Sequence, residues 1–182
     1  MVSLPNLITL GRLFCVPVAI WLVLTGEIAG AFWIFLLAGL SDAVDGFIAK
    51  RFNLRSRLGA FLDPAADKAL LVSMYVTLGV SQLLPVWLVI LVVFRDVVII
   101  GAFLLVTALS QPMRWEPLLV SKLNTALQIA LVGLILFRLG FGIRFFDLHK
   151  PMIYAVAATT FISGAAYLVR WMRALAGSET AS

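Results

Sequence analysis

Six long apolar stretches constrain this chain more than any other feature. Each is long enough to cross a bilayer as a helix, which takes about 20 mostly apolar residues. Of the 182 residues, 63% are hydrophobic and only 13% are charged, so the bilayer is expected to be the solvent. We predict an all-α integral membrane protein, one domain over residues 1–182, with six transmembrane helices near residues 7–24, 28–48, 58–80, 85–109, 118–139 and 152–172.

The distribution of Lys and Arg predicts the orientation of these helices. Basic residues gather near the termini and the second and fourth connections, while the odd-numbered connections carry only Arg138, Arg144 and Lys150. Because basic loops stay on the cytoplasmic side, both termini are expected to be cytoplasmic. The opening SLPNLITLGR predicts a short interfacial segment that leads into the first span. His149 is expected to be a loop residue on the far side.

The formal charge of +5 suggests contact with anionic lipid headgroups, and we expect no nucleic-acid partner. The N-terminus shows neither a signal peptide nor a transit peptide, so the first helix is expected to remain in the mature protein. We expect a bacterial inner (plasma) membrane. A trimmed chain from the mitochondrial inner membrane is the alternative.

Two acidic stripes flank the second connection. Aspartates inside apolar spans are costly, at about 2.5 to 3.5 kcal/mol or more for a central charge. A partner cation or a position nearer the interface would explain a single one. The first stripe has a spacing of i, i+3, i+4 and i+7 and comprises Asp42, Asp45, Gly46 and Ala49. The second has a spacing of i, i+4 and i+8 and comprises Gly59, Asp63 and Asp67.

A tight helical hairpin would bring the four carboxylates of these stripes to one depth, a few residues inside the cytoplasmic face. So many close carboxylates cannot all stay ionised unless cations neutralise them. Carboxylate ligands without His or Cys favour Mg²⁺ or Mn²⁺, and shared carboxylates suit a two-metal site. The small residues leave room for a ligand, and basic side chains stand beside them at Lys50, Arg51, Arg55 and Arg57. The pattern indicates a diphosphate ligand at the cytoplasmic face.

The segment DAVDGFIAKRFNLRSRLGAFLDPAADK resembles the signature of the CDP-alcohol phosphotransferase family, D-x2-D-G-x2-A-R-x8-G-x3-D-x3-D. Every spacing matches. Lys50 stands where the family has Arg, and Lys cannot form the bidentate contact that Arg makes with phosphate. The positions that agree are Asp42, Asp45, Gly46, Ala49, Gly59, Asp63 and Asp67.

The resemblance implies a six-helix membrane fold that forms a homodimer. It also implies two metal ions on Asp42, Asp45, Asp63 and Asp67, with Asp67 as the general base for the acceptor hydroxyl. Expected contacts with the CDP-lipid are Asn6, Thr9, Asp42, Gly46, Ala49, Lys50, Arg57 and Gly59.

Other segments resemble the cardiolipin synthase branch of the family, namely LPNLITLGR, LAGLSDAVDGFIA, FRDVV and SKLNTALQ. This resemblance implies that CDP-diacylglycerol is the donor, phosphatidylglycerol the acceptor, and cardiolipin and CMP the products. Phosphatidylglycerophosphate synthases share a similar opening and a similar Arg in the fourth span. Glycerol 3-phosphate therefore remains the alternative acceptor.

Arg95 falls near the middle of the fourth predicted span, where an isolated charge would be costly. One interpretation is a structural pair with Asp96 or another buried Asp. The other, favoured by the family resemblance, is contact with the phosphate of the acceptor, together with Lys122 and Asn124. The last two residues could instead cap the fifth helix.

Two rival functions use similar residues. An ion-coupled transporter would also place Asp and Arg within spans, but its usual inverted repeats do not stand out here. A membrane-embedded prenyl transferase would need two separated Asp-rich motifs. In this sequence both acidic stripes flank one short connection.

Overall fold

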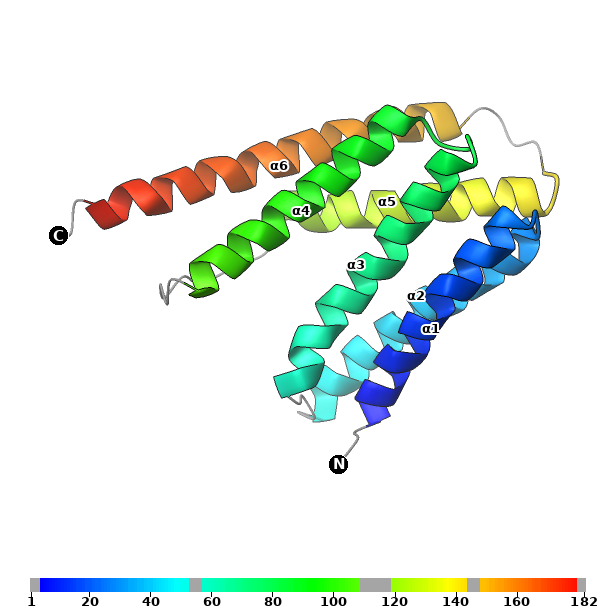
Figure 1. The fold of residues 1–182 in the computed structure, drawn as a ribbon, viewed down its shortest axis with the longest axis horizontal. Coiled ribbons are helices and arrows are strands. Elements are labelled where there is room, and N and C mark those ends of the chain that lie inside the picture. The colour runs from blue at the N-terminus through cyan, green and yellow to red at the C-terminus, as the bar shows by residue number, and fades with distance from the viewer. Residues whose placement is uncertain (1–3, 53–56, 109–118, 144–147, 180–182) are drawn as a thin grey trace. The chain divides into compact units, whose positions relative to one another are not determined.

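The computed structural model describes the backbone of residues 4–52, 57–108, 119–143 and 148–179, and the side chains of residues 11–41, 68–101, 119–143 and 148–171. Within these ranges the protein is entirely helical and contains no strand, as predicted (Figure 1). The helices are α1 (Leu4–Leu24), α2 (Ile28–Phe52), α3 (Arg57–Val80), α4 (Val86–Ala108), α5 (Leu119–Gly140) and α6 (His149–Glu179).

Each predicted apolar stretch coincides with one of these helices, and most ends agree within a few residues. Two helices extend beyond the predicted stretches. α2 continues to Phe52 and α6 continues to Glu179. Both extensions contain Ala, Lys, Arg or Leu, which favour helix even where the apolar pattern has ended. Hydropathy marks the membrane-compatible part of a helix and not its last residue.

One local prediction is corrected, and another is only partly described. The opening segment is helical from Leu4 and runs without interruption into the first apolar stretch, and its interfacial position stays a prediction. Pro5 fits there, since the first turn of a helix needs no partner for its N–H groups. His149 is the first residue of α6 and not a loop residue. Pro151 lies in the first turn of α6, where proline again starts a helix without breaking it.

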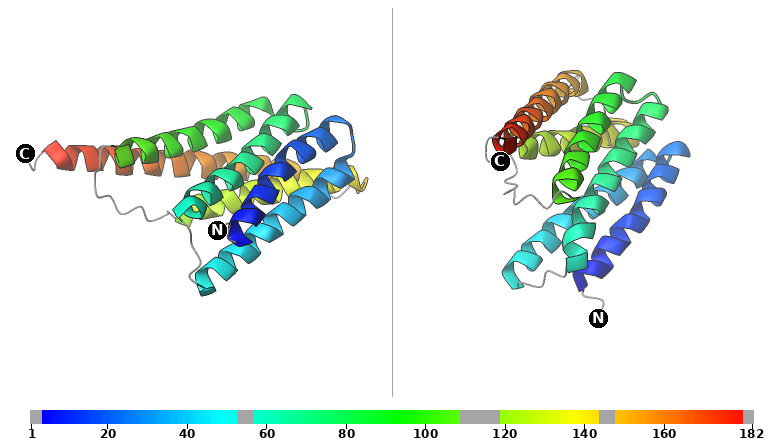
Figure 2. Two further views of the ribbon diagram at one scale, coloured as in Figure 1. Left: turned by 60° about the horizontal axis from the view of Figure 1, so that its bottom comes forward. Right: turned by 60° about the vertical axis from the view of Figure 1, so that its left-hand side comes forward.

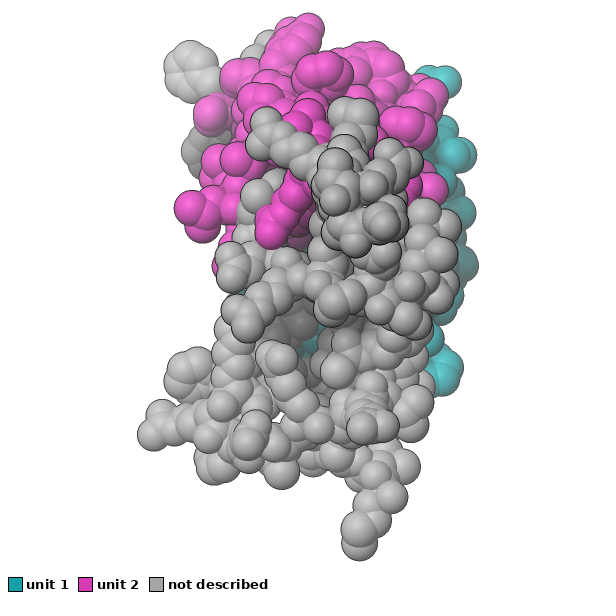
Figure 3. All heavy atoms as spheres, turned by 90° about the vertical axis from the view of Figure 1, so that its left-hand side faces the viewer, with its two compact units in different colours: residues 1–85, 132–146 teal, residues 86–131, 147–182 magenta. Residues whose placement is uncertain are grey.

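The chain divides into two compact units, coloured separately in Figure 3, and each is described by itself. Unit 1 comprises residues 1–85 and 132–146, which include α1, α2, α3 and the C-terminal part of α5. α1 packs against both α2 and α3 (Figures 1 and 2). The start of α2 lies against the end of α5, where Phe32 and Phe137 have ring centroids 5.4 Å apart.

Unit 2 comprises residues 86–131 and 147–182, which include α4, α6 and the N-terminal part of α5. α4 packs against α6. Trp87 stacks on Tyr154 at 6.3 Å, and further along both helices Arg95 donates a hydrogen bond to Ser163, so α4 and α6 run in the same direction. Contacts between α5 and α6 advance in opposite directions along the two helices, so this pair is antiparallel.

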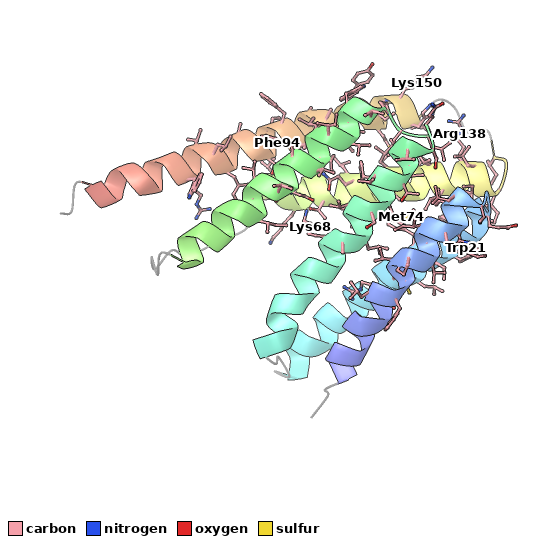
Figure 4. All side chains as sticks on the ribbon, in the orientation of Figure 1. Trp21, Lys68, Met74, Phe94, Arg138 and Lys150 are labelled. Atoms are coloured by element: carbon pink, nitrogen blue, oxygen red, sulfur yellow. The ribbon has the colours of Figure 1, made fainter. Side chains whose placement is uncertain are left out.

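The described surface carries many large apolar side chains, and part of the interior is polar, as expected when a bilayer is the solvent. On α4 the labelled Phe94 is 63% exposed, whereas the next residue, Arg95, is 4% exposed (Figure 4). Exposed Trp33, Trp87 and Tyr154 lie near helix ends, where aromatic side chains often mark a membrane interface. Within the described residues, two helical segments are long and apolar enough to cross a membrane, residues 119–140 and 149–171.

Candidate functional site

The acidic motif lies on two consecutive helices of unit 1. Asp42, Asp45 and Lys50 belong to the last turns of α2, and Asp63 and Asp67 belong to the first turns of α3. The backbone is helical through all of these positions, so the spacings predicted for the two stripes apply. Residues 53–56 connect the two helices, and the side chains of residues 42–67 lie outside the described set.

The remaining predicted contacts of the CDP-lipid belong to the same unit. Gly46 and Ala49 lie on α2, and Arg57 and Gly59 open α3. Asn6 and Thr9 lie in the first turns of α1, with side chains that also fall outside the described set. Because α1 packs against both α2 and α3, one unit contains every helix that carries the predicted nucleotide and metal residues.

The donor set of the motif fits hard divalent cations. Aspartates supply only oxygen ligands, and these suit Mg²⁺ or Mn²⁺ better than softer metals. The two continuous helices repeat the carboxylates once per turn along one face each. The described side chains contain no group of three or more His, Cys, Asp or Glu arranged to hold a metal, and the side chains of the motif lie outside the described set. The two-metal site therefore stays a prediction.

Arg95 lies in a polar cluster inside unit 2. Its Nη1 donates to Oδ1 of Asp96 at 2.6 Å, and its Nη2 donates to Oγ of Ser163 at 2.7 Å and to Oγ of Ser121. Arg95 and Asp96 are only 4% and 2% exposed. The structural pair predicted between these two residues is confirmed. The charge is accommodated inside an apolar span by an ion pair and two hydroxyl groups.

Asn124 lies one turn further along α5 from Ser121 and is fully buried. Its Oδ1 accepts hydrogen bonds from the hydroxyls of Thr159 and Thr160, each at 2.9 Å. Thr160 lies one turn from Ser163 on α6. The contacts of Arg95, which reaches in from α4, and of Asn124 thus lie on neighbouring helical turns of α5 and α6.

The structure separates Lys122 from these two residues. Lys122 is exposed on α5. Residues two positions apart on a helix are rotated by about 200° around its axis, so their side chains point in nearly opposite directions. Asn124 faces α6, so Lys122 does not share its face. Of the three residues predicted to bind the acceptor, Arg95 and Asn124 belong to one buried polar cluster, and Lys122 does not.

Sequence reasoning missed the partners of this cluster, namely Ser121, Thr159, Thr160 and Ser163. A signal was present, because Thr160, Ser163 and Gly164 recur at i, i+3 and i+4 within an apolar span. Gly164 lies beside Arg95, since a Cβ added there would be 3.6 Å from Arg95 Cγ. Small and hydroxylated residues at this spacing are typical of close helix packing in membranes.

Comparison with known proteins identifies the family. The family model of the CDP-alcohol phosphatidyltransferases matches residues 2–171, and the chain belongs to this family. Its members are membrane enzymes that generally use divalent metals. The family assignment agrees with the resemblance carried by the acidic motif on α2 and α3.

Three relatives illustrate the range of named activities. A "cardiolipin synthase (CMP-forming) / mitochondrial hydrolase fusion protein" of Schizosaccharomyces pombe is 36% identical over 92% of this chain and 31% of its own length. A "cardiolipin synthase (CMP-forming)" of Rattus norvegicus is 37% identical over 72% of this chain and 49% of its own length. The chain thus spans about half or less of these two relatives.

A "CDP-diacylglycerol--glycerol-3-phosphate 3-phosphatidyltransferase" of Bacillus subtilis is 30% identical over 98% of this chain and all of its own length. The relatives therefore bear the names of two different enzymes. Two are named for cardiolipin and for forming CMP, and the third is named for phosphatidyl transfer from CDP-diacylglycerol with glycerol 3-phosphate.

Proposed function

We propose that this protein is a cardiolipin synthase of the CMP-forming type, which transfers the phosphatidyl group of CDP-diacylglycerol to phosphatidylglycerol. The observation that carries the proposal is the set of four motif aspartates near the end of α2 and the start of α3, in a chain that belongs to the CDP-alcohol phosphatidyltransferases. The relatives named cardiolipin synthase support the choice of acceptor. The roles proposed below for the residues that contact the substrates depend on the same family assignment.

In the proposed reaction, Asp67 takes the proton from the acceptor hydroxyl as that oxygen attacks the phosphorus next to the diacylglycerol. A new bond forms between this phosphorus and the acceptor oxygen, and the bond to the CMP phosphate oxygen breaks. Two divalent cations, when bound to Asp42, Asp45, Asp63 and Asp67, neutralise charge on the diphosphate. Lys50 and Arg57 attract the diphosphate, and Gly46, Ala49 and Gly59 leave space for it.

Arg95 and Asn124 each keep a buried N–H donor without an acceptor among the described residues, which supports a role for these residues toward the acceptor. A guanidinium group recognises phosphate strongly, and an amide N–H adds a neutral donor. We therefore assign the acceptor phosphate to Arg95 and Asn124. The protein is proposed to act as a homodimer with its active site facing the cytoplasm, in a bacterial plasma membrane or the mitochondrial inner membrane.

A second candidate is phosphatidylglycerophosphate synthase, with glycerol 3-phosphate as the acceptor. It is favoured by the Bacillus subtilis relative, which aligns with this chain over its whole length. The chemistry at the donor is the same for both candidates. Only the identity of the attacking hydroxyl differs.

The deciding experiment supplies the purified protein with CDP-diacylglycerol and Mg²⁺ or Mn²⁺, then offers phosphatidylglycerol and glycerol 3-phosphate in separate reactions. Release of CMP and formation of the lipid product are measured. We expect CMP release and cardiolipin with phosphatidylglycerol. Turnover with glycerol 3-phosphate alone would establish the second candidate instead, and no turnover with either would contradict both.

A further inference from the structure

Nε of Arg95 and Nδ2 of Asn124 are buried N–H donors in unit 2 that have no hydrogen-bond acceptor among the described residues. Leaving a buried donor unpaired costs about 1 to 3 kcal/mol, and native proteins do so rarely. An unpaired donor held by well-ordered neighbours is therefore a candidate contact for a substrate.

The partners of these two side chains determine where the unpaired donors point. Both hydrogen atoms of Arg95 Nη2 have hydroxyl acceptors, Ser121 on α5 and Ser163 on α6, and Nη1 is held by Asp96. A guanidinium group is planar and rigid, so fixing both terminal nitrogens also fixes the direction of Nε–H. Arg95 cannot turn this donor elsewhere without breaking several hydrogen bonds.

Asn124 is held from α6 in the same manner. The hydroxyl of Thr160 has Asn124 Oδ1 as its acceptor, whereas the hydroxyl of Thr159 also lies within hydrogen-bonding distance of the carbonyl oxygens of Ala155 and Val156. Since a hydroxyl donates one proton, Thr160 is the more specific of the two contacts. With Oδ1 turned toward Thr160, Nδ2 is left as a donor on the other branch of the amide.

The contacts of Arg95 and those of Asn124 lie about one helical turn apart. Ser121 and Asn124 are three positions apart on α5, and Thr160 and Ser163 are three positions apart on α6. The unpaired donors therefore belong to neighbouring helical turns. A negatively charged group with several acceptor oxygens suits such a pair. Phosphate is such a group, and hydrogen bonds from a cation to phosphate are among the stronger ones in proteins.

We infer that Thr160 and Ser163 of α6 are positioning residues of the acceptor site. They hold Asn124 and Arg95 so that Nδ2 of the one and Nε of the other donate to phosphate oxygens of the acceptor. This inference rests on the proposed function, and it assigns α6 a role that the motif on α2 and α3 does not reveal. The shared chemistry is a phosphate oxygen, carried by either a lipid phosphodiester or a free phosphomonoester.

The test compares Thr160→Val, which removes the hydroxyl and keeps the side-chain shape, with Thr160→Ser, which keeps the hydroxyl. Thr77→Val is the matched control, because Thr77 is also buried but donates to Ser73 O within α3. We expect Thr160→Val to raise the KM for the acceptor about fivefold to tenfold, which corresponds to one hydrogen bond. The KM for CDP-diacylglycerol should be unchanged. Thr160→Ser and Thr77→Val should stay within about twofold of the unaltered protein.

Ser163→Ala is expected to act in the same direction, because Arg95 loses one of the hydroxyls that orient it. Phosphatidylglycerol and glycerol 3-phosphate are offered separately, so the results also distinguish the lipid phosphodiester from the soluble phosphomonoester. The rise in unfolding temperature caused by each acceptor gives a second readout that needs no turnover.

The two possible failures can be told apart. If the unaltered protein turns over with neither acceptor and is stabilised by neither, both the proposed function and this inference are wrong. If the unaltered protein is active but Thr160→Val and Thr160→Ser have the same acceptor KM, the inference alone is overturned. Equal increases in KM for donor and acceptor would also overturn it, since they indicate general damage to the fold.

Discussion

Nη1 of Arg95 lies 2.6 Å from Oδ1 of Asp96, so two residues adjacent in the sequence form an ion pair inside a span. Both side chains are almost completely buried. Removing one partner of a buried pair leaves an uncompensated charge and is strongly destabilising, whereas removing both charges together costs less. The pair therefore makes a direct prediction about stability.

Asp96→Asn should lower the free energy of unfolding by about 3 kcal/mol, because the charge of Arg95 would lose its closest counter-charge. The double variant Arg95→Gln with Asp96→Asn should lose less than the sum of the two single variants, with a coupling of about 1 to 3 kcal/mol. Thermal unfolding in detergent measures all four proteins. Strictly additive effects would show that the pair contributes no net stabilisation.

Asp67→Asn should retain binding of the CDP-lipid and lose turnover, because the amide cannot accept the proton of the acceptor hydroxyl. A decrease in kcat of at least about 100-fold is expected if Asp67 is the general base. Binding of CDP-diacylglycerol and CMP release are measured on the same preparation. Glu27→Gln serves as the control, since Glu27 is an exposed acid in the turn between α1 and α2. Normal turnover in Asp67→Asn would remove this residue from the base role.

Removal of divalent cations should abolish CMP release and restoration of Mg²⁺ or Mn²⁺ should recover it. The physical reason is the negative charge on the diphosphate, which two divalent cations held by the four aspartates of the motif would neutralise. The measurement is CMP release during treatment with a chelator and after addition of each metal. A normal rate of CMP release after thorough chelation would contradict the two-metal hypothesis.

Gly140→Ala should destabilise the protein by about 1 to 3 kcal/mol, the usual cost of overpacking. A Cβ at this position would lie 2.8 Å from the backbone N and Cα of Ala29, so α5 and α2 would have to separate. Gly133→Ala on the same helix is the control, because nothing lies within 4 Å of its added Cβ. That change should be neutral or slightly stabilising, since Ala favours helix more than Gly does. Equal unfolding temperatures for the two variants would contradict the close approach.

Much of the secondary structure could be predicted from the sequence, because long apolar runs in a chain with few charges satisfy their backbone hydrogen bonds as helices. The acidic motif was recognisable for a related reason. Its residues stand at helical spacings within a stretch of 26 residues, from Asp42 to Asp67, so local geometry suffices to place them on two helix faces.

Only the tertiary structure could show which polar residues of unit 2 meet. Thr160 follows Asn124 by 36 positions and Ser163 follows Arg95 by 68, and no periodicity links residues so far apart. Each hydroxyl could equally have bonded to the carbonyl of its own helix, as Thr125 does to Ser121 O. The packing of α6 against α4 and α5 decides the matter, because it turns particular hydroxyls toward the amide of Asn124 and the guanidinium of Arg95.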